Sequence, residues 1–485
     1  MNMEWKRNDV IFLILCTLLG ILAEQSFFHG TIGISYLVFI AALYWVFFYR
    51  FKHFPFTNRR IGFFVLFSIW MLSANFFLYD NMLFYVLNQL VIPALVVLHL
   101  SLITGHKAVK WNRIAFIFYT LHRLFSTIPY VKTILQLLQN ERKPLTANRS
   151  MQTAAKVAIG LLLSIPLLFI VIMLLSSADE QFSRIVGNLP HLLSDVSVGE
   201  YIFRLLVVVF FSAILFGYMQ VLYARKEIDA PIIHISRFLD PVIICTILFM
   251  VNAVYVLFAY LQFHYLFSGT LQGGFTFAEY ARRGFFELIA VSLINLSLLN
   301  GVITFTDTIN NAFKRGVQIL LTVLITASGV MLTSAFTRLS LYESVYGFTM
   351  DRVLPHSFML LLAVIFIFTL IKVWIERLSL VRFYFISCLA YYTALNSVNV
   401  EQFVVDQNMK RYEETGKIDI QHIGALSYTG TNALITLYEK DPKNNQIKQL
   451  LMEKKAMVAG EQETWQSYNL LKKTVRERLE KLELK

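Results

Sequence analysis

Residues 241–261 read PVIICTILFMVNAVYVLFAYL, a stretch that contains no charged side chain. A helix needs about 20 such residues to cross the roughly 30 Å hydrocarbon core of a bilayer. The same apolar character recurs along the chain at Val10–Ala23, Thr31–Tyr49, Ile61–Tyr79, Met82–Thr104, Val157–Leu175, Tyr201–Tyr223, Phe285–Phe305, Val317–Ser334, Leu354–Trp374 and Leu378–Leu395. We therefore predict an all-α fold, a polytopic transmembrane helix bundle of about eleven spans, with about ten or twelve as alternatives.

The composition agrees with a membrane protein. The 485 residues are 57% hydrophobic and 15% charged, with a mean hydropathy of +0.59, whereas a soluble chain has roughly 25% charged residues. The net charge of +12 sits in connectors between apolar runs, so it indicates topology rather than a nucleic-acid partner. The isolated cysteines Cys16, Cys245 and Cys388 offer neither a disulfide framework nor metal-ligand spacing.

Basic residues predict the orientation. Lys and Arg gather on every second connector, beginning at the N-terminus, which places the N-terminus in the cytoplasm. An odd number of spans then places the C-terminus outside. The outer connectors and span ends hold few basic residues, namely Arg184, Arg204, Arg282, Arg283, Arg338 and Arg352.

Four segments divide the chain. Residues 1–104 form a four-span N-terminal segment, and residues 157–395 form a seven-span core. Between them lies a basic cytoplasmic connector, residues 105–156, in which Ile114–Asn140 has the periodicity of an amphipathic helix. This helix is expected either to lie in the headgroup region or to pack on the bundle, and the sequence leaves both open.

Residues 396–485 form the fourth segment, a small extracytoplasmic α-helical domain. Helical periodicity covers Val400–Glu414, with Gly416 as its C-cap, and the shorter segments Asn432–Lys440 and Gln446–Lys455. The longest helix predicted in this tail, Glu461–Leu484, carries a stripe of leucine and valine.

No motif in the sequence points to a reaction. There is no phosphate-binding glycine loop, and no two histidines stand three or four residues apart, so neither a cofactor nor a metal is predicted. We predict no catalytic residue, and an enzyme is the less favoured class.

Charged residues at the outer membrane edge are few, which makes each one informative. Asp179 follows the fifth apolar run, either as a helix N-cap or as a buried polar group. Glu287 enters the apolar region, so Arg283 one turn earlier is its expected partner. Asn295 lies about two turns deeper and continues the same helical face.

Four arginines on the outer side offer an anion-binding surface. Arg282, Arg283, Arg338 and Arg352 lie where basic residues are normally rare, and Tyr342 stands one turn after Arg338. Arginine binds phosphate or carboxylate in a bidentate manner, so we predict that these five residues bind an anion. The alternative is that each arginine anchors its own span to lipid headgroups.

Polar residues inside the apolar runs have a simpler expected role. An amide in hydrocarbon is costly without a hydrogen-bond partner. We therefore expect hydrogen bonds between helices, rather than a transport path, from Asn88, Gln89, His99, Gln220, Asn252, Asn295 and Asn300.

Several short motifs resemble a known family. They are SAD at 177–179, YARRGFFEL at 280–288, RLSLY at 338–342, YGFT at 346–349, NMKRY at 408–412, TGKID at 415–419 and WQSYNL at 465–470. This set resembles bacterial polytopic membrane proteins of unknown function, the domain-of-unknown-function family four-one-seven-three with the related family four-one-five-three. The resemblance runs from about Lys156 to the C-terminus. It implies a bacterial cell membrane and no reaction.

Three function classes follow. We favour a non-enzymatic envelope protein, a sensor or assembly protein whose tail binds a protein partner. The second class is a transporter or lipid-handling protein that uses the outer arginines and Glu287. The third is a membrane enzyme acting on a lipid-linked anionic substrate. The expected partners are the lipid bilayer and an anionic lipid or envelope component.

Overall fold

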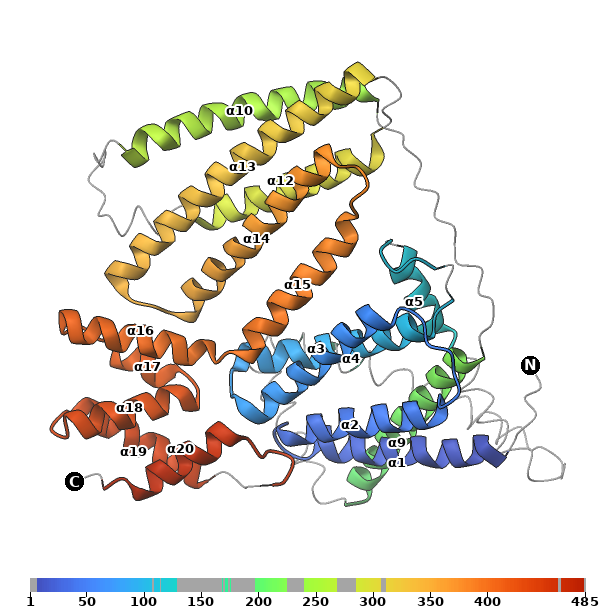
Figure 1. Cartoon of the computed structure of the whole chain (residues 1–485). Helices are drawn as coiled ribbons and strands as arrows, with labels where there is room; N and C mark the ends of the chain where they lie inside the picture. The colour runs from blue at the N-terminus through green and yellow to red at the C-terminus, as the bar shows by residue number, and fades with distance from the viewer. Residues whose placement is uncertain are drawn as a thin grey trace.

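The computed structural model describes residues 7–106, 109–113, 115–128, 197–224, 240–267, 285–306, 311–460 and 464–483, with isolated positions between 168 and 175. In this part of the chain every element is an α-helix (Figure 1), which confirms the predicted all-α fold. The helices form two bundles, a helix that joins them, and a tail domain.

Eight of the described helices are long and apolar enough to cross a membrane: Asp9–Phe28, Arg59–Leu78, Met82–Thr104, Phe203–Tyr223, Pro241–Leu261, Phe286–Phe305, Phe313–Tyr346 and Met350–Trp374. The apolar helix α2 (Ile34–Arg50) is shorter, and α15 (Leu380–Ser397) covers the last predicted run. The predicted span Val157–Leu175 lies largely outside the described residues. The chain is a multi-pass membrane protein.

The N-terminal bundle consists of α1 (Arg7–Phe28), α2, α3 (Arg59–Leu78), α4 (Met82–Thr104) and α9 (Ser197–Tyr223). The first and last of these pack along one another, with the rings of Phe12 and Phe216 5.4 Å apart. Gly20 permits the approach, because a Cβ there would come within 2.5 Å of the Val208 carbonyl oxygen. Small residues serve this purpose between membrane helices.

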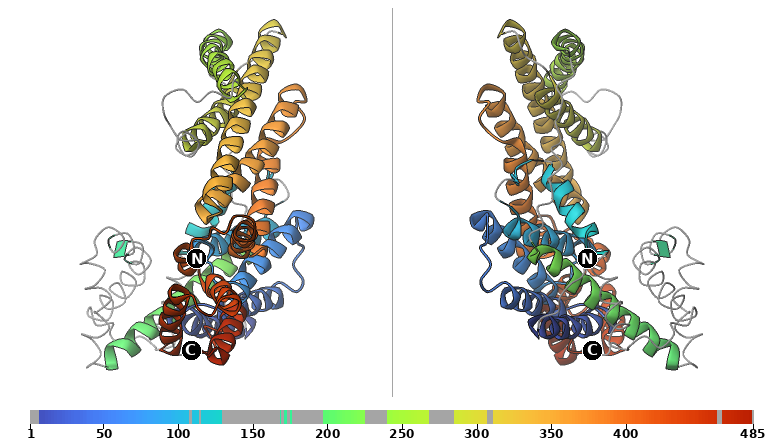
Figure 2. Two further views of the ribbon diagram at one scale, coloured as in Figure 1. Left: turned by 90° about the vertical axis from the view of Figure 1, so that its left-hand side faces the viewer. Right: turned by 90° about the vertical axis from the view of Figure 1, so that its right-hand side faces the viewer.

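The C-terminal bundle consists of α10 (Pro241–Phe267), α12 (Phe285–Phe305), α13 (Asn311–Tyr346) and α14 (Met350–Trp374). The long helix α13 packs against the other three and supplies buried Leu324 and Leu339 to the core. Figure 2 shows this bundle extending away from the N-terminal one.

Polar side chains in both bundles confirm the expected bonds between helices for all but Gln89, which has no such bond among the described residues. The pairs in the described spans are His99 with Tyr44, Gln220 with Arg50, Asn88 with Asn396, Asn252 with the Leu320 carbonyl and Asn295 with Ser328. Asn300 donates to the Leu296 carbonyl of its own helix and also forms a hydrogen bond with Tyr384 of α15.

Helix α15 joins the two bundles, packing against α14 on one side and α3 on the other. Toward α14 the rings of Phe383 and Phe368 stack 3.7 Å apart. Toward the N-terminal bundle, the Tyr392 hydroxyl donates to Asn88 Oδ1 over 2.7 Å. If one bundle moves relative to the other, α15 must therefore move or deform with them, or lose its contacts with one of them.

The tail domain contains α16 (Val400–Thr415), α17 (Ile420–Ala425), α18 (Tyr428–Lys440), α19 (Asn445–Ala459) and α20 (Leu470–Lys481). Gly416 ends α16 in the left-handed conformation, with φ of 69°, as its position in the sequence predicts. The tail core is closed by buried leucine and valine, namely Val404, Leu434, Leu451, Val475 and Leu479.

Consecutive helices run in opposite directions, so the molecule has two distinct ends. The tail domain packs at the end that holds the connections α1–α2, α3–α4 and α13–α14 (Figures 1 and 2). We call this the tail end. The opposite end of the N-terminal bundle holds Arg50, Thr104 and Tyr223, where α2, α4 and α9 finish.

Candidate functional site

The tail end is the candidate functional site, because the tail domain makes buried polar contacts with both bundles there. In the contact with the N-terminal bundle, the backbone N–H of Gly33 donates to the Gln466 carbonyl over 2.8 Å. The N–H of Ile34 donates to the Tyr468 carbonyl over 3.0 Å. A Cβ at Gly33 would lie 2.5 Å from that Tyr468 oxygen, so glycine is required for this approach.

Asn469 strengthens the same contact. Its Nδ2 donates to the carbonyls of Phe76 and Tyr79, at 3.0 and 2.8 Å, where α3 ends. Its Oδ1 accepts from the N–H of Lys472 and caps α20. One buried side chain thus serves the end of a membrane helix and the beginning of a tail helix.

Glu401 is a buried carboxylate between the tail and the α3–α4 connection. It accepts hydrogen bonds from Asn81 Nδ2, at 2.9 Å, and from the Ser427 hydroxyl. Burial raises the pKa of this carboxyl, the Ser427 hydrogen bonds lower it, and nearby Asp80 raises it. We call the contacts of Gly33, Ile34, Asn469 and Glu401 the N-terminal seat.

The second contact, the C-terminal seat, grips the turn between α13 and α14. Asn408 accepts from the Phe348 N–H at 2.9 Å and donates to the carbonyl of the same residue at 2.7 Å. Arg411 donates to the Val345 carbonyl over 2.6 Å. Gly347 adopts φ of 83°, and a Cβ there would lie 2.6 Å from Asn408 Oδ1.

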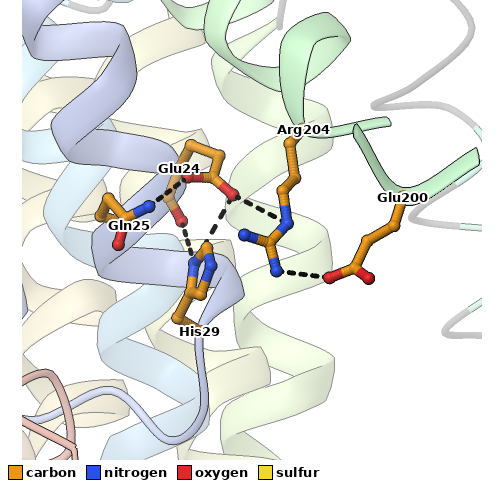
Figure 3. A network of polar contacts seen from close by, with 5 residues as sticks. All are labelled: Glu24, Gln25, His29, Glu200 and Arg204. Atoms are coloured by element: carbon orange, nitrogen blue, oxygen red, sulfur yellow. Dashed lines mark hydrogen bonds and ion pairs between the residues drawn. The ribbon is translucent and has the colours of Figure 1, made fainter. Parts of the chain in front are cut away.

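A buried carboxylate also lies in the first span, close to this end (Figure 3). Glu24 is 3% exposed, and its Oε1 lies 3.5 Å from His29 Nδ1 and 3.8 Å from Arg204 Nε of α9. Arg204 pairs in turn with Glu200. Gln25 donates to the second Glu24 oxygen over 3.0 Å. An ionisable group buried in a span commonly has a functional role.

The C-terminal bundle repeats this arrangement of a buried carboxylate beside a histidine. Glu343 of α13 is 5% exposed, and its Oε2 lies 2.9 Å from His356 Nδ1 of α14. The imidazole stacks edge-on against Phe336, with ring centroids 3.9 Å apart. As at Glu24, one carboxylate oxygen has no hydrogen bond among the described residues.

The predicted site residues fall into three groups. Tyr342 and Arg352 meet, with the guanidinium 4.2 Å from the ring centroid. Arg338 is buried one turn away on α13. Asp179, Arg282 and Arg283 lie outside the described residues, so the shared anion surface and the Arg283 pairing stay predictions.

Glu287 and Asn295 occupy different surroundings on α12. Glu287 is exposed in the first turn, whereas Asn295 is fully buried and donates to Ser328 Oγ over 2.8 Å. Asn295 therefore fastens α12 to α13. Figure 1 shows α12 beginning toward the end of the bundle where α13 finishes and α14 begins.

Several residues of the site were not predicted from the sequence. Glu24 and His29 flank the first apolar run, and a charged residue beside such a run is a readable signal. Glu401, Asn408 and Asn469 give no such signal, since their partners are remote in the chain.

The sequence profile of the family described as Domain of unknown function (DUF4153) matches residues 66–437, more than half of the chain. The chain belongs to this family. Of the two families that its motifs resemble, this is the one named four-one-five-three, and the other is not confirmed. The match begins in α3, well before Lys156, and ends in α18. No curated protein and no solved structure matches the chain.

Proposed function

We propose that this protein is a non-enzymatic membrane protein of the bacterial cell envelope, a sensor or assembly protein whose tail domain responds to the relative position of the two bundles. The observation that carries the proposal is the double seat of the tail. The tail is bonded to the N-terminal bundle through Asn469 and to the α13–α14 turn through Asn408.

A folded domain seated on two bundles converts a change between them into a change in itself. Rigid-body rotation of one packed unit against another is a common switching movement. Here the side chains of Asn469, Glu401 and Asn408 are buried in the seats, and leaving one of them unpaired costs about 1–3 kcal/mol. The seats therefore favour an intact docked state over intermediate arrangements, and the exposed surface of the tail remains available to a partner.

The orientation proposed from the basic residues places the tail outside the cytoplasm. A signal from the envelope would then reach the tail first and pass to the bundles. A bound assembly partner would act in the same way, by stabilising one arrangement of the seats.

A transporter is the second candidate, and one observation favours it. Glu24 and Glu343 are carboxylates buried in candidate spans, each beside a histidine. Chains of such groups carry protons in pumps and transporters. We propose this class only for protons or ions coupled to them, because these groups offer titratable sites.

Distance measurements between spin labels test the sensor proposal. In a variant without Cys16, Cys245 and Cys388, one label replaces Phe63 on the N-terminal bundle and a second replaces Ile367 on α14, both of which are exposed. In lipid nanodiscs, Asn469→Ala and Asn408→Ala are each expected to broaden the distance distribution between the bundles. Exposed Asn445→Ala is the matched control and is expected to leave it unchanged.

Two outcomes contradict the proposal. A distribution between the bundles that is indifferent to both seat variants shows that the tail does not link them. Proton flux through reconstituted vesicles that disappears in Glu24→Gln and Glu343→Gln replaces the sensor with the transporter.

A further inference from the structure

Helix α5 (Ala115–Phe125) has two opposite faces, one packed inside the protein and one exposed. One face is buried against α4 and α9 and consists of Phe116, Tyr119, Thr120 and Arg123. The other face is formed by Ile117, Phe118, Leu121 and Phe125, which are between 42% and 65% exposed. At 100° per residue these four side chains span an arc of about 100°.

Arg123 fixes the height of α5 at the ends of two spans. Its guanidinium donates to the Ser101 carbonyl at 3.4 Å, to Thr104 Oγ1 at 3.1 Å and to the Leu222 carbonyl at 3.3 Å. These partners belong to the last turns of α4 and α9, where a cation is favoured by the helix dipole. The apolar face of α5 therefore lies at the level where two membrane spans finish.

The surroundings of α5 are cationic. Exposed basic residues at this end are Lys52, Arg59, Arg60, Lys110 and Arg113. Between residues 50 and 128 the sequence holds one acidic residue, Asp80, and it lies at the tail end, in the α3–α4 connection. An apolar helical face bordered by basic residues is complementary to the surface of an anionic bilayer.

We propose that α5 is a membrane-contacting helix whose face Ile117, Phe118, Leu121 and Phe125 inserts at the boundary of headgroups and acyl chains. The basic residues beside it prefer anionic phospholipids, which attract Lys and Arg near the membrane surface. The inner contacts of Arg123 carry any tilt of this helix directly to the ends of α4 and α9. This inference is independent of the proposed sensor function.

An environment-sensitive fluorophore tests the location of this face. In the cysteine-free variant, Phe118→Cys carries the label, and exposed Glu453→Cys on α19 of the tail domain is the water-exposed control. The nanodiscs contain phosphatidylcholine alone or phosphatidylcholine with phosphatidylglycerol. At position 118 we expect quenching by lipid-borne nitroxide and protection from aqueous iodide, and at position 453 the reverse.

A separate measurement tests the preference for anionic phospholipid. Phosphatidylglycerol is expected to deepen the lipid quenching at position 118, and the double variant Lys110→Gln, Arg113→Gln is expected to remove most of that increase. An increase that survives in the double variant overturns the anionic preference.

Two results overturn membrane contact itself. Iodide quenching at position 118 places the face in water. Protection from iodide without lipid quenching shows that protein covers it, whether another part of this chain or a second copy.

Discussion

The two seats of the tail domain hold it in different ways. The N-terminal seat joins two connections of the N-terminal bundle to separate parts of the tail, and its contacts include backbone pairing and a buried carboxylate. The C-terminal seat is a single turn held by side chains of one helix, α16, and its Arg411 is only half-buried. We infer that the first seat anchors the tail and that the second is the one able to adjust.

A glycine stands at the centre of each seat, which allows a direct comparison. At Gly33 an added Cβ would meet backbone atoms of Gln466, Ser467 and Tyr468, which cannot move without disturbing the tail. At Gly347 the added Cβ would meet the side chain of Asn408, which can rotate. The same substitution at both positions therefore reports how rigid each seat is.

Gly33→Ala is expected to have the largest effect. Overpacking against fixed backbone costs about 3 kcal/mol, which would release residues 464–470 from the α1–α2 connection. The measurement is thermal unfolding in detergent, together with hydrogen exchange of the segment around Asn469. Gly301→Ala in α12, where the added Cβ would enter open space beside the helix, is the control. A stability equal to that of the control would show that the N-terminal seat is not rigid.

Gly347→Ala is expected to destabilise less. The left-handed conformation at φ of 83° costs roughly 1–2 kcal/mol for an alanine, and Asn408 absorbs the steric conflict by rotating. Hydrogen exchange is expected to rise at Phe348, while the segment around Asn469 stays protected. Simultaneous loss of protection at both places would mean that the two seats are one cooperative unit, against the distinction drawn above.

The spans could be predicted because lipid imposes a length and an apolar composition on each helix. The predicted run Met82–Thr104 coincides with α4, and Pro241–Leu261 opens α10. Helix α13 continues to Tyr346, past the predicted end at Ser334, because residues beyond the apolar run pack against α14. Such packing is not visible in local composition.

The tail helices were predicted less completely. The position of Gly416 correctly gave the end of α16. The last helix begins at Leu470 rather than at the predicted Glu461, because Asn469 caps it while bonding to α3. The short helix α17 was not predicted, since six residues give no measurable period.

The seats themselves could not be read from the sequence. Asn469 and Phe76 are separated by 393 positions, and Asn81 and Glu401 by 320. No spacing rule links residues so far apart. Charged residues are rare near the apolar runs, and this rarity is a signal that the sequence does contain. It singles out Glu343, and also Glu24 when the residues that flank the first apolar run are considered.

The smallest expected effect concerns pH and tests the N-terminal seat through its buried carboxylate, Glu401. Burial between Asn81 and Ser427 raises the pKa of Glu401 above its ordinary value of 4.5. The docked tail therefore holds this proton more tightly than the released tail, so docking is strongest below pH 4.5 and weakens as the pH rises through the raised pKa.

As the pH falls from 7 toward 5, the unfolding temperature of the protein is expected to rise. This rise should be smaller than the decrease caused by either glycine substitution. Asp80 is a charged group near Glu401, so Glu401→Gln is the control that isolates the Glu401 carboxylate. The glutamine keeps an acceptor for Asn81 and stays neutral, and its unfolding temperature should vary less with pH. A pH dependence unchanged in Glu401→Gln would assign the effect to other groups and leave the N-terminal seat insensitive to acid.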